Sequence, residues 1–191
     1  MRLVIGLGNP GIKYMGTRHN VGFDVLNELA KRYGAGAAQK KYQSDVQDVM
    51  IHGEKVLLVA PLTFMNLSGD AVWQHVKFYQ PEASEIVVIC DDMNLPAGRI
   101  RWRASGSAGG QKGLSHIIQR LGHQEFPRLR IGVGRPPGRM DATTWVLGRF
   151  RDGEQDDVKA SIVRAADSIE SWCARGIEAT MNEFNRNPDE S

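Results

Sequence analysis

The stretch IVVIC at residues 86–90 decides the fold class of this 191-residue chain. It is an unbroken run of apolar and mostly β-branched residues, which is typical of a β-strand that is covered on both faces. The run RLVIGL at residues 2–7 predicts a second buried strand. Strands covered on both faces need helices on both sides of their sheet, so these two runs favour an α/β fold.

Helical and strand-like patterns alternate along the rest of the chain. Apolar residues at helical spacing predict helices that begin near residues 20, 68, 114 and 158, with Ser68 as the cap of the second helix. Strand-like runs lie at residues 46–51, 55–60, 98–103 and 129–133. We therefore expect residues 1–191 to form a single α/β domain with a mostly parallel central sheet, and the tail after about residue 185 to be frayed.

The composition excludes several classes of protein. Apolar residues make up 41% and charged residues 24% of the chain, as in globular proteins, and the 21 glycines follow no collagen-like triplet period. The longest apolar runs are far too short to cross a bilayer, and no signal-peptide pattern precedes the first strand. Cys90 and Cys173 are too few for a disulfide framework, so we expect a cytoplasmic protein with no membrane association.

The charge is distributed unevenly. Residues 96–140 contain nine lysines and arginines against one acidic residue, Glu125, a net charge of +8, whereas the whole chain has a net charge of +2. Such a block is expected where a protein binds a polyanion, although a merely solvated basic face gives the same pattern. Glycines and Trp102 lie within the block and favour the binding site.

The motif GLGNPG at residues 6–11 matches the G-x-G-x-x-G pattern of dinucleotide-binding folds. In those folds the helix begins within the glycines, and an acidic residue follows the second strand. Here Pro10 interrupts the motif, the helix begins only near residue 18, and Asp24 and Glu28 come too early for the acidic position. We therefore expect no nucleotide cofactor.

Polar residues follow three of the predicted strands. Asn9 comes after the first strand, Asn66 after the strand that ends near residue 60, and Asp91 directly after the IVVIC run. Ligands of open α/β sheets bind at the carboxyl ends of the strands, so these side chains are expected at one edge, next to His19 at the start of the first helix. Taken singly, each has an ordinary explanation as a turn former, a helix cap, a solvated strand end or a hydrogen-bonding histidine.

Together, these residues indicate general-base catalysis. A carboxylate beside a histidine fixes its tautomer and stabilises the charge that the ring gains with a proton. The sequence has no G-x-S-x-G nucleophile motif, Cys90 lies in a buried run, and the remaining histidines lack metal-ligand spacing. A His19–Asp91 base acting on water, with asparagine amides holding a polarised carbonyl, suits hydrolysis of an activated acyl compound such as an ester, without a metal or cofactor.

A glycine-rich loop at residues 105–113 leads into the third helix. Its glycines let a ligand approach the backbone closely, and Lys112 at a helix N-terminus attracts phosphate. With Arg103 before it and Arg130 after it, the loop is suited to a nucleic-acid backbone, while a tight structural loop is the alternative.

Six motifs, in order, resemble those of bacterial-type peptidyl-tRNA hydrolases. They are GLGNPG (6–11), TRHNVG (17–22), PLTFMNLSG (61–69), DDMNLPAG (91–98), GSAGGQKG (106–113) and LRIGVG (129–134). The resemblance implies a single domain with a twisted, mixed sheet flanked by helices. It also implies cleavage of the ester that joins a peptide to the 3′ end of tRNA, so the expected partner is peptidyl-tRNA, bound through its acceptor stem and 3′ end. We expect a monomer.

The same resemblance implies roles for individual residues. His19 is implied to be the base that activates water, Asp91 to stabilise it, and Asn9 to distinguish N-blocked peptidyl-tRNA from free aminoacyl-tRNA. The residues implied to bind the terminal nucleotide, the peptide or, for the two arginines, tRNA phosphate are Tyr14, Phe64, Asn66, Arg103 and Arg130.

One motif departs from the family pattern. Many members have G-G-H-N-G where this chain has GGQKG at residues 109–113. The family's asparagine at the position of Lys112 contacts substrate and helps to hold the water, whereas a lysine donates hydrogen bonds and binds phosphate but cannot accept as an amide does. The alternative function is that of a non-catalytic, RNA-binding relative, like the splicing factors of plant organelles. The intact histidine, aspartate and asparagine set favours the hydrolase.

Overall fold

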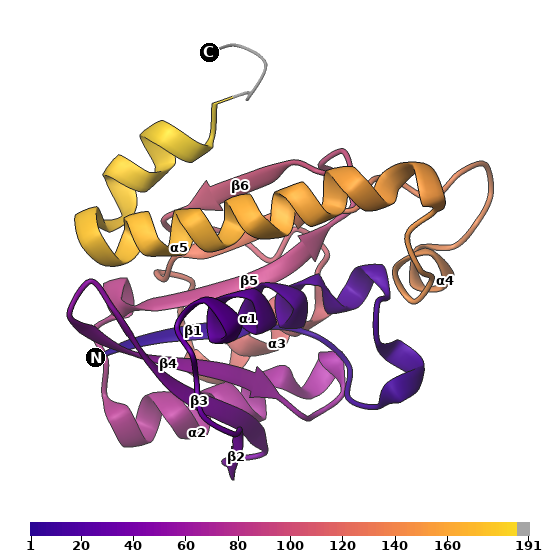
Figure 1. The fold of residues 1–191 in the computed structure, drawn as a ribbon. Coiled ribbons are helices and arrows are strands. Elements are labelled where there is room, and N and C mark those ends of the chain that lie inside the picture. The colour runs from indigo at the N-terminus through magenta and orange to yellow at the C-terminus, as the bar shows by residue number, and fades with distance from the viewer. Residues whose placement is uncertain (187–191) are drawn as a thin grey trace.

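The computed structural model describes residues 1–186, which form a seven-stranded sheet with helices on both faces (Figure 1). The spatial order of the strands is β2-β3-β4-β1-β5-β7-β6. Their bounds are β1 (Arg2–Gly6), β2 (Gln39–Lys41), β3 (Ser44–Ile51), β4 (Glu54–Pro61), β5 (Ile86–Asp92), β6 (Ile100–Arg103) and β7 (Arg128–Gly132). Most of the expected frayed tail falls on residues 187–191, which lie outside the described residues.

The four central strands, β4, β1, β5 and β7, run parallel to one another, and β2, β3 and β6 pair antiparallel at the two sides. The predicted α/β fold with a mixed, mostly parallel sheet is therefore confirmed. The position of Asp91 was predicted wrongly, because β5 continues beyond the IVVIC run. Asp91 pairs with Ile131 of β7 and so lies within the strand instead of after it.

Two helices cover each face of the sheet (Figure 1). The helices are α1 (Val21–Arg32), α2 (Ser68–Tyr79), α3 (Lys112–Leu121), α4 (Ala142–Val146) and α5 (Gln155–Phe184), with short 3-10 turns at Ile12–Tyr14, Arg18–Asn20, Met65–Leu67, Ala83–Glu85 and Asp152–Glu154. Alternate residues of β1 point to opposite faces. Val4 packs in the core beneath α1 and α5, whereas Leu3 and Ile5 pack in the core beneath α2 and α3.

The start of α2 differs from the prediction that Ser68 caps it. Ser68 is already the first helical residue, and its hydroxyl donates a 2.8 Å hydrogen bond back to the carbonyl of Met65. The 3-10 turn Met65–Leu67 runs directly into α2. The extended backbone that a capping serine needs is therefore absent at residue 68. The turn instead fixes residues 65 and 66 at the carboxyl end of β4.

The last helix folds back on itself and covers one side of the sheet. Gly176 interrupts α5 with a φ of 80°, a conformation that favours glycine. Beyond it, the side chain of Asn185 accepts a hydrogen bond from the Trp102 N–H at 2.7 Å and donates one to the Trp102 carbonyl at 3.1 Å. One amide thus satisfies backbone groups of the edge strand β6.

Candidate active site

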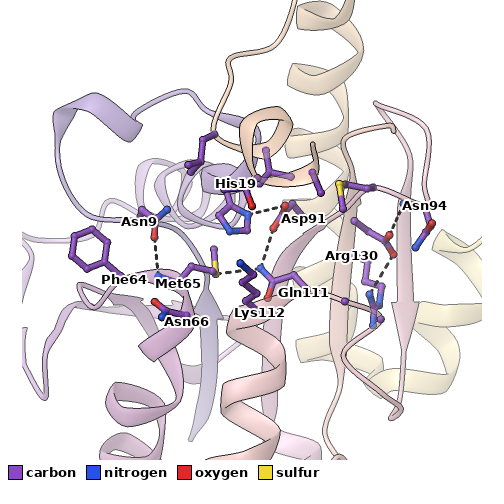
Figure 2. Close-up of a pocket in the computed structure, with 18 residues that line it drawn as sticks. Asn9, His19, Phe64, Met65, Asn66, Asp91, Asn94, Gln111, Lys112 and Arg130 are labelled. Carbon is purple, nitrogen blue, oxygen red and sulfur yellow. Dashed lines mark hydrogen bonds and ion pairs between the residues drawn. The ribbon is translucent and has the colours of Figure 1, made fainter. Parts of the chain in front are cut away.

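A cavity of about 350 Å³ opens at the carboxyl ends of the central strands (Figure 2). Its walls come from the loops after β1 and β4, the end of β5, the start of α3 and the short helix α4. Among the residues that line it are Asn9, His19, Asn66 and Asp91, which the sequence analysis expected at one edge of the sheet. The parallel order of the central strands explains this, since their carboxyl ends share one edge of the sheet.

His19 and Asp91 are in direct contact in the wall of the cavity. The Nδ1 atom of His19 lies 2.8 Å from Oδ2 of Asp91. Asp91 is only 4% exposed, so little water competes for its carboxylate. His19 belongs to the 3-10 turn that precedes α1. With Nδ1 engaged, Nε2 is the ring nitrogen that can accept a proton from a molecule in the cavity.

The side chain of Asn9 is held in one orientation. Its Oδ1 accepts a 2.8 Å hydrogen bond from the backbone N–H of Met65, and Figure 2 shows its Nδ2 on the side of His19. Asn20, which follows His19 directly, fixes the backbone of Asn9 by accepting from its N–H at 2.9 Å and donating to its carbonyl at 3.0 Å. Asn20 is a residue that the sequence analysis missed, and its place in the TRHN motif was the available signal.

Gln111 is a second missed residue. It is 7% exposed, and its amide nitrogen donates to the other carboxylate oxygen of Asp91, Oδ1, at 3.0 Å. The amide oxygen accepts from the N–H of Leu114 at 2.7 Å and so caps α3. Both oxygens of Asp91 are therefore bonded. The sequence signal was the departure from the family's G-G-H-N-G motif at residues 109–113, but the sequence analysis interpreted only Lys112 within it.

Sequence and fold both match one family of known proteins. The model of the peptidyl-tRNA hydrolase family matches residues 3–191. The chain belongs to this family. It is 50% identical over 185 residues to the peptidyl-tRNA hydrolase of Syntrophomonas wolfei, covering 97% of this chain and 100% of that relative, and 45% identical to the one of Rhodopirellula baltica, covering 97% of each. The crystal structure of peptidyl-tRNA hydrolase from Acinetobacter baumannii has a TM-score of 0.91 and 34% identity, covering 97% of this chain and 94% of that one.

These matches confirm the family and the class of enzyme that the six motifs predicted. They also confirm the fold, because the Acinetobacter baumannii structure is related in sequence as well as in shape.

Two aromatic residues that the resemblance singled out lie at the edge of the cavity. Phe64 lines it and is 54% exposed. Tyr14 meets the ring of Phe64 edge-on, with 6.5 Å between the ring centroids, and stands outside the residues that line the cavity. A ligand inside the cavity therefore contacts Phe64 directly, and it contacts Tyr14 only if it extends past the rim of the cavity.

Lys112 lies between two hollows of the surface. It is the first residue of α3 and lines the main cavity, where Figure 2 shows it beside Gln111. Together with Asn66 it also lines a neighbouring cavity of about 310 Å³ on the outer side of α3. A cation at the start of a helix adds to the positive field of the helix N-terminus. This position suits a negatively charged part of a ligand.

The two arginines of the expected phosphate clamp differ in their surroundings. Arg130 lines the cavity, lies 3.3 Å from Oδ2 of Asp92 and donates to the Ser107 carbonyl at 2.9 Å. Arg103 is exposed on the edge strand β6 and is not part of the cavity wall. Arg101 of β6 pairs with Arg130 of β7, so these two side chains point to the same face of the sheet. Arg103 comes two residues after Arg101 on the same strand and therefore points to that face as well.

Arg128 belongs to the basic block in sequence but not to the basic surface. It is completely buried, and its guanidinium donates to the carbonyls of Gly106, Gln124 and Phe126. Burial, followed by the charge of Arg130, lowers the pKa of Arg128 to about 10, so it stays charged at neutral pH. Its charge holds the loop before β7 together instead of facing a polyanion.

The described residues 1–186 contain no group of three or more His, Cys, Asp or Glu side chains that could hold a metal ion. Within the same residues, no helix is long and apolar enough to span a membrane. Cys90 is fully buried in β5, and burial raises the pKa of its thiol to about 12, which keeps it protonated and unreactive.

Proposed function

We propose that this chain hydrolyses the ester bond between the peptide and the tRNA of peptidyl-tRNA, with His19 as the general base and Asp91 as its partner. The main support is the 2.8 Å contact between Nδ1 of His19 and Oδ2 of Asp91 in the wall of the cavity. Membership of the peptidyl-tRNA hydrolase family supports the substrate. No metal or cofactor takes part in the proposed reaction.

The reaction needs a proton acceptor next to an electrophile. Nε2 of His19 takes a proton from a water molecule while the water oxygen bonds to the ester carbonyl carbon, and Asp91 stabilises the imidazolium that forms. The bond between that carbon and the ribose 3′ oxygen then breaks, and the imidazolium returns the proton to this oxygen. The products are tRNA with a free 3′ hydroxyl and a peptide with a free carboxyl group.

Asn9 and Asn66 supply amide donors in this proposal. The Nδ2 group of Asn9 binds the carbonyl of the first peptide bond, since its Oδ1 is already engaged by Met65. A free aminoacyl-tRNA has an ammonium group and no such carbonyl, so Asn9 favours the N-blocked substrate. Asn66, beside it in the cavity wall, donates to the polarised ester carbonyl.

The tRNA docks, in this proposal, through its acceptor stem and 3′ end on the exposed part of the basic block. Arg103 and Arg130 contact phosphates, and Lys112 binds the backbone near the terminal nucleotide. Tyr14 and Phe64 offer ring faces to the terminal base or the peptide. In this proposal the protein acts as a monomer in the cytoplasm, where translation produces its substrate.

The alternative is an RNA-binding relative without turnover, which the replacement of the family motif by Gln111 and Lys112 favours. The decisive experiment compares hydrolysis of an N-acetyl-aminoacyl-tRNA with that of the unblocked aminoacyl-tRNA, both with a chelator present. Release of tRNA from the blocked substrate alone supports the proposal. Salt-sensitive tRNA binding without release supports the alternative and contradicts the proposed reaction.

A further inference from the structure

Gln111 makes three contacts that together fix both its position and its orientation. Its Nε2 lies 3.0 Å from Oδ1 of Asp91 and 3.2 Å from the sulfur of Met65, and its Oε1 accepts the Leu114 N–H at 2.7 Å. The oxygen must face Leu114, which offers a hydrogen, and the nitrogen must face the carboxylate, which offers none. The amide therefore presents a donor to Asp91, and a flipped amide would lose both bonds.

This donor completes the bonding of a buried charge. Asp91 is 4% exposed, and its Oδ2 is already bonded to Nδ1 of His19. A buried carboxylate oxygen without a donor costs free energy, and a carboxylate bonded at one oxygen only is free to rotate about its Cβ–Cγ bond. Gln111 bonds the second oxygen and so keeps Oδ2 directed at His19.

Gln111 also bonds Asp91 without adding a charge next to it. The amide is neutral at every pH, so it bonds the carboxylate without neutralising its charge. The full negative charge of Asp91 remains available to the imidazolium that His19 becomes during the reaction. Lys112, the adjacent cation, lies at the exposed start of α3 and forms no hydrogen bond or ion pair with Asp91 among the described residues.

We propose that Gln111 is a positioning residue of the reaction, which holds Asp91 in the orientation that aligns His19 while also capping α3. The inference rests on the proposed His19–Asp91 mechanism. Both polar atoms of its amide are engaged by the protein, so Gln111 acts through Asp91. At a position where many family members have a histidine, Gln111 supplies this chain with a donor to Asp91.

The test separates the two roles of Gln111 by substitution. In Gln111→Ser the hydroxyl still caps α3, because serine is a preferred N-cap residue, but it is too short to reach Asp91. We expect kcat to fall on the order of 10- to 100-fold, the loss expected for a hydrogen bond to a charged group, with KM unchanged within about twofold. In Gln111→His the imidazole offers one donor and one acceptor, and kcat recovers to within about threefold of the unsubstituted enzyme.

Two further measurements keep a structural effect apart from a positioning effect. The proton on Nδ1 of His19 gives a downfield NMR signal that reports its bond to Asp91. This signal shifts or broadens in Gln111→Ser and returns in Gln111→His. Gln39→Ser, an exposed glutamine of the edge strand β2, is the control and leaves both kcat and the signal unchanged.

A Gln111→Ser enzyme with the kcat and the NMR signal of the unsubstituted protein would overturn the proposal and leave Gln111 as a helix cap alone. Failure of the underlying mechanism looks different. In that case His19→Ala retains turnover. The NMR signal, measured in the proteins that keep His19, still reports whether Gln111 positions the His19–Asp91 pair.

Discussion

The guanidinium of Arg18 lies 3.5 Å from the centroid of the Trp145 ring, which joins the residue before His19 to helix α4. Arg18 is 2% exposed and also forms a 2.7 Å ion pair with Glu154. Trp145 is fixed in turn by a 2.8 Å hydrogen bond from its Nε1 to the Gly134 carbonyl. Because α4 forms one wall of the cavity, Arg18 links that wall to the segment that contains His19.

Replacing Arg18 by glutamine is expected to lower the free energy of unfolding by about 3 kcal/mol, because Glu154 and the face of Trp145 lose a buried partner. It should also lower kcat, since α4 and His19 lose their common support. Urea unfolding and hydrolysis assays measure the two effects. Arg151→Gln is the control, because Arg151 is exposed and lies 5.3 Å from the same ring. Equal losses in the two variants would contradict a special role of Arg18.

The contact between His19 and Asp91 predicts which step each substitution impairs. His19→Ala should reduce kcat by at least about 100-fold, the usual contribution of a general base, and leave the Kd for tRNA unchanged within about threefold. Asp91→Asn keeps the shape of the side chain but removes the charge that stabilises the imidazolium, and should act in the same direction. Hydrolysis of N-acetyl-aminoacyl-tRNA and filter binding of free tRNA give the two readouts. Full turnover in His19→Ala would remove the general-base assignment.

Substitution of the two arginines of the proposed clamp should affect tRNA binding in the same way but kcat differently. Arg103→Ala removes one exposed contact to phosphate, so the slope of log K against log salt concentration should fall by about 1, with kcat unchanged. Arg130→Ala should show the same change of slope together with a lower kcat, because Arg130 also bonds Asp92 and Ser107 beside the cavity. Lys55→Ala is the control. Lys55 lies at the amino end of β4, away from the carboxyl ends that form the cavity, and its substitution should change neither the salt slope nor kcat. An unchanged salt slope in both arginine variants would exclude this docking face.

The parts of the fold that could be predicted are those with a strong local signal. The apolar runs at residues 2–7 and 86–90 are the central strands β1 and β5, and the helical spacing after residues 20, 68, 114 and 158 gave four of the helices. Strand β2, with the sequence QKK, has no apolar pattern and forms only because β3 pairs with it. The five-residue helix α4 is too short to show a period.

The sequence predicted those residues of the candidate site whose positions follow from the motif order and the sheet topology. It did not predict residues whose role depends on a contact with a partner distant in sequence. Asn9, His19, Asn66 and Asp91 meet because parallel strands share one edge. Gln111 was missed because its bond to Asp91 exists only in three dimensions. Arg128 was counted among the surface charges because charge in the sequence does not show burial, and its guanidinium is in fact enclosed by the carbonyls of Gln124 and Phe126.

His75 should make the stability of the protein depend on pH. It is fully buried in α2, with its ring parallel to that of Tyr79 at 6.2 Å and the ring of Tyr42 edge-on at 5.2 Å. Burial, and then the charge of Lys41, lowers the pKa of His75 from 6.5 to about 4. Between these two values the unfolded chain binds a proton that the folded chain does not. The free energy of unfolding therefore falls as the pH drops below about 6.5 and stops falling, on account of this residue, near pH 4.

His75→Phe keeps an aromatic ring between Tyr42 and Tyr79 but removes the proton-binding site. Between pH 7 and pH 4, we expect the free energy of unfolding of the substituted protein to fall by up to about 3 kcal/mol less than that of the unsubstituted protein. The reason is that each unit of pKa shift corresponds to about 1.4 kcal/mol. Urea unfolding at several pH values in this range measures the difference. His123→Gln, an exposed histidine changed as a control, should follow the unsubstituted curve. If His75→Phe follows that curve as well, the acid sensitivity arises from other groups and His75 is not its source.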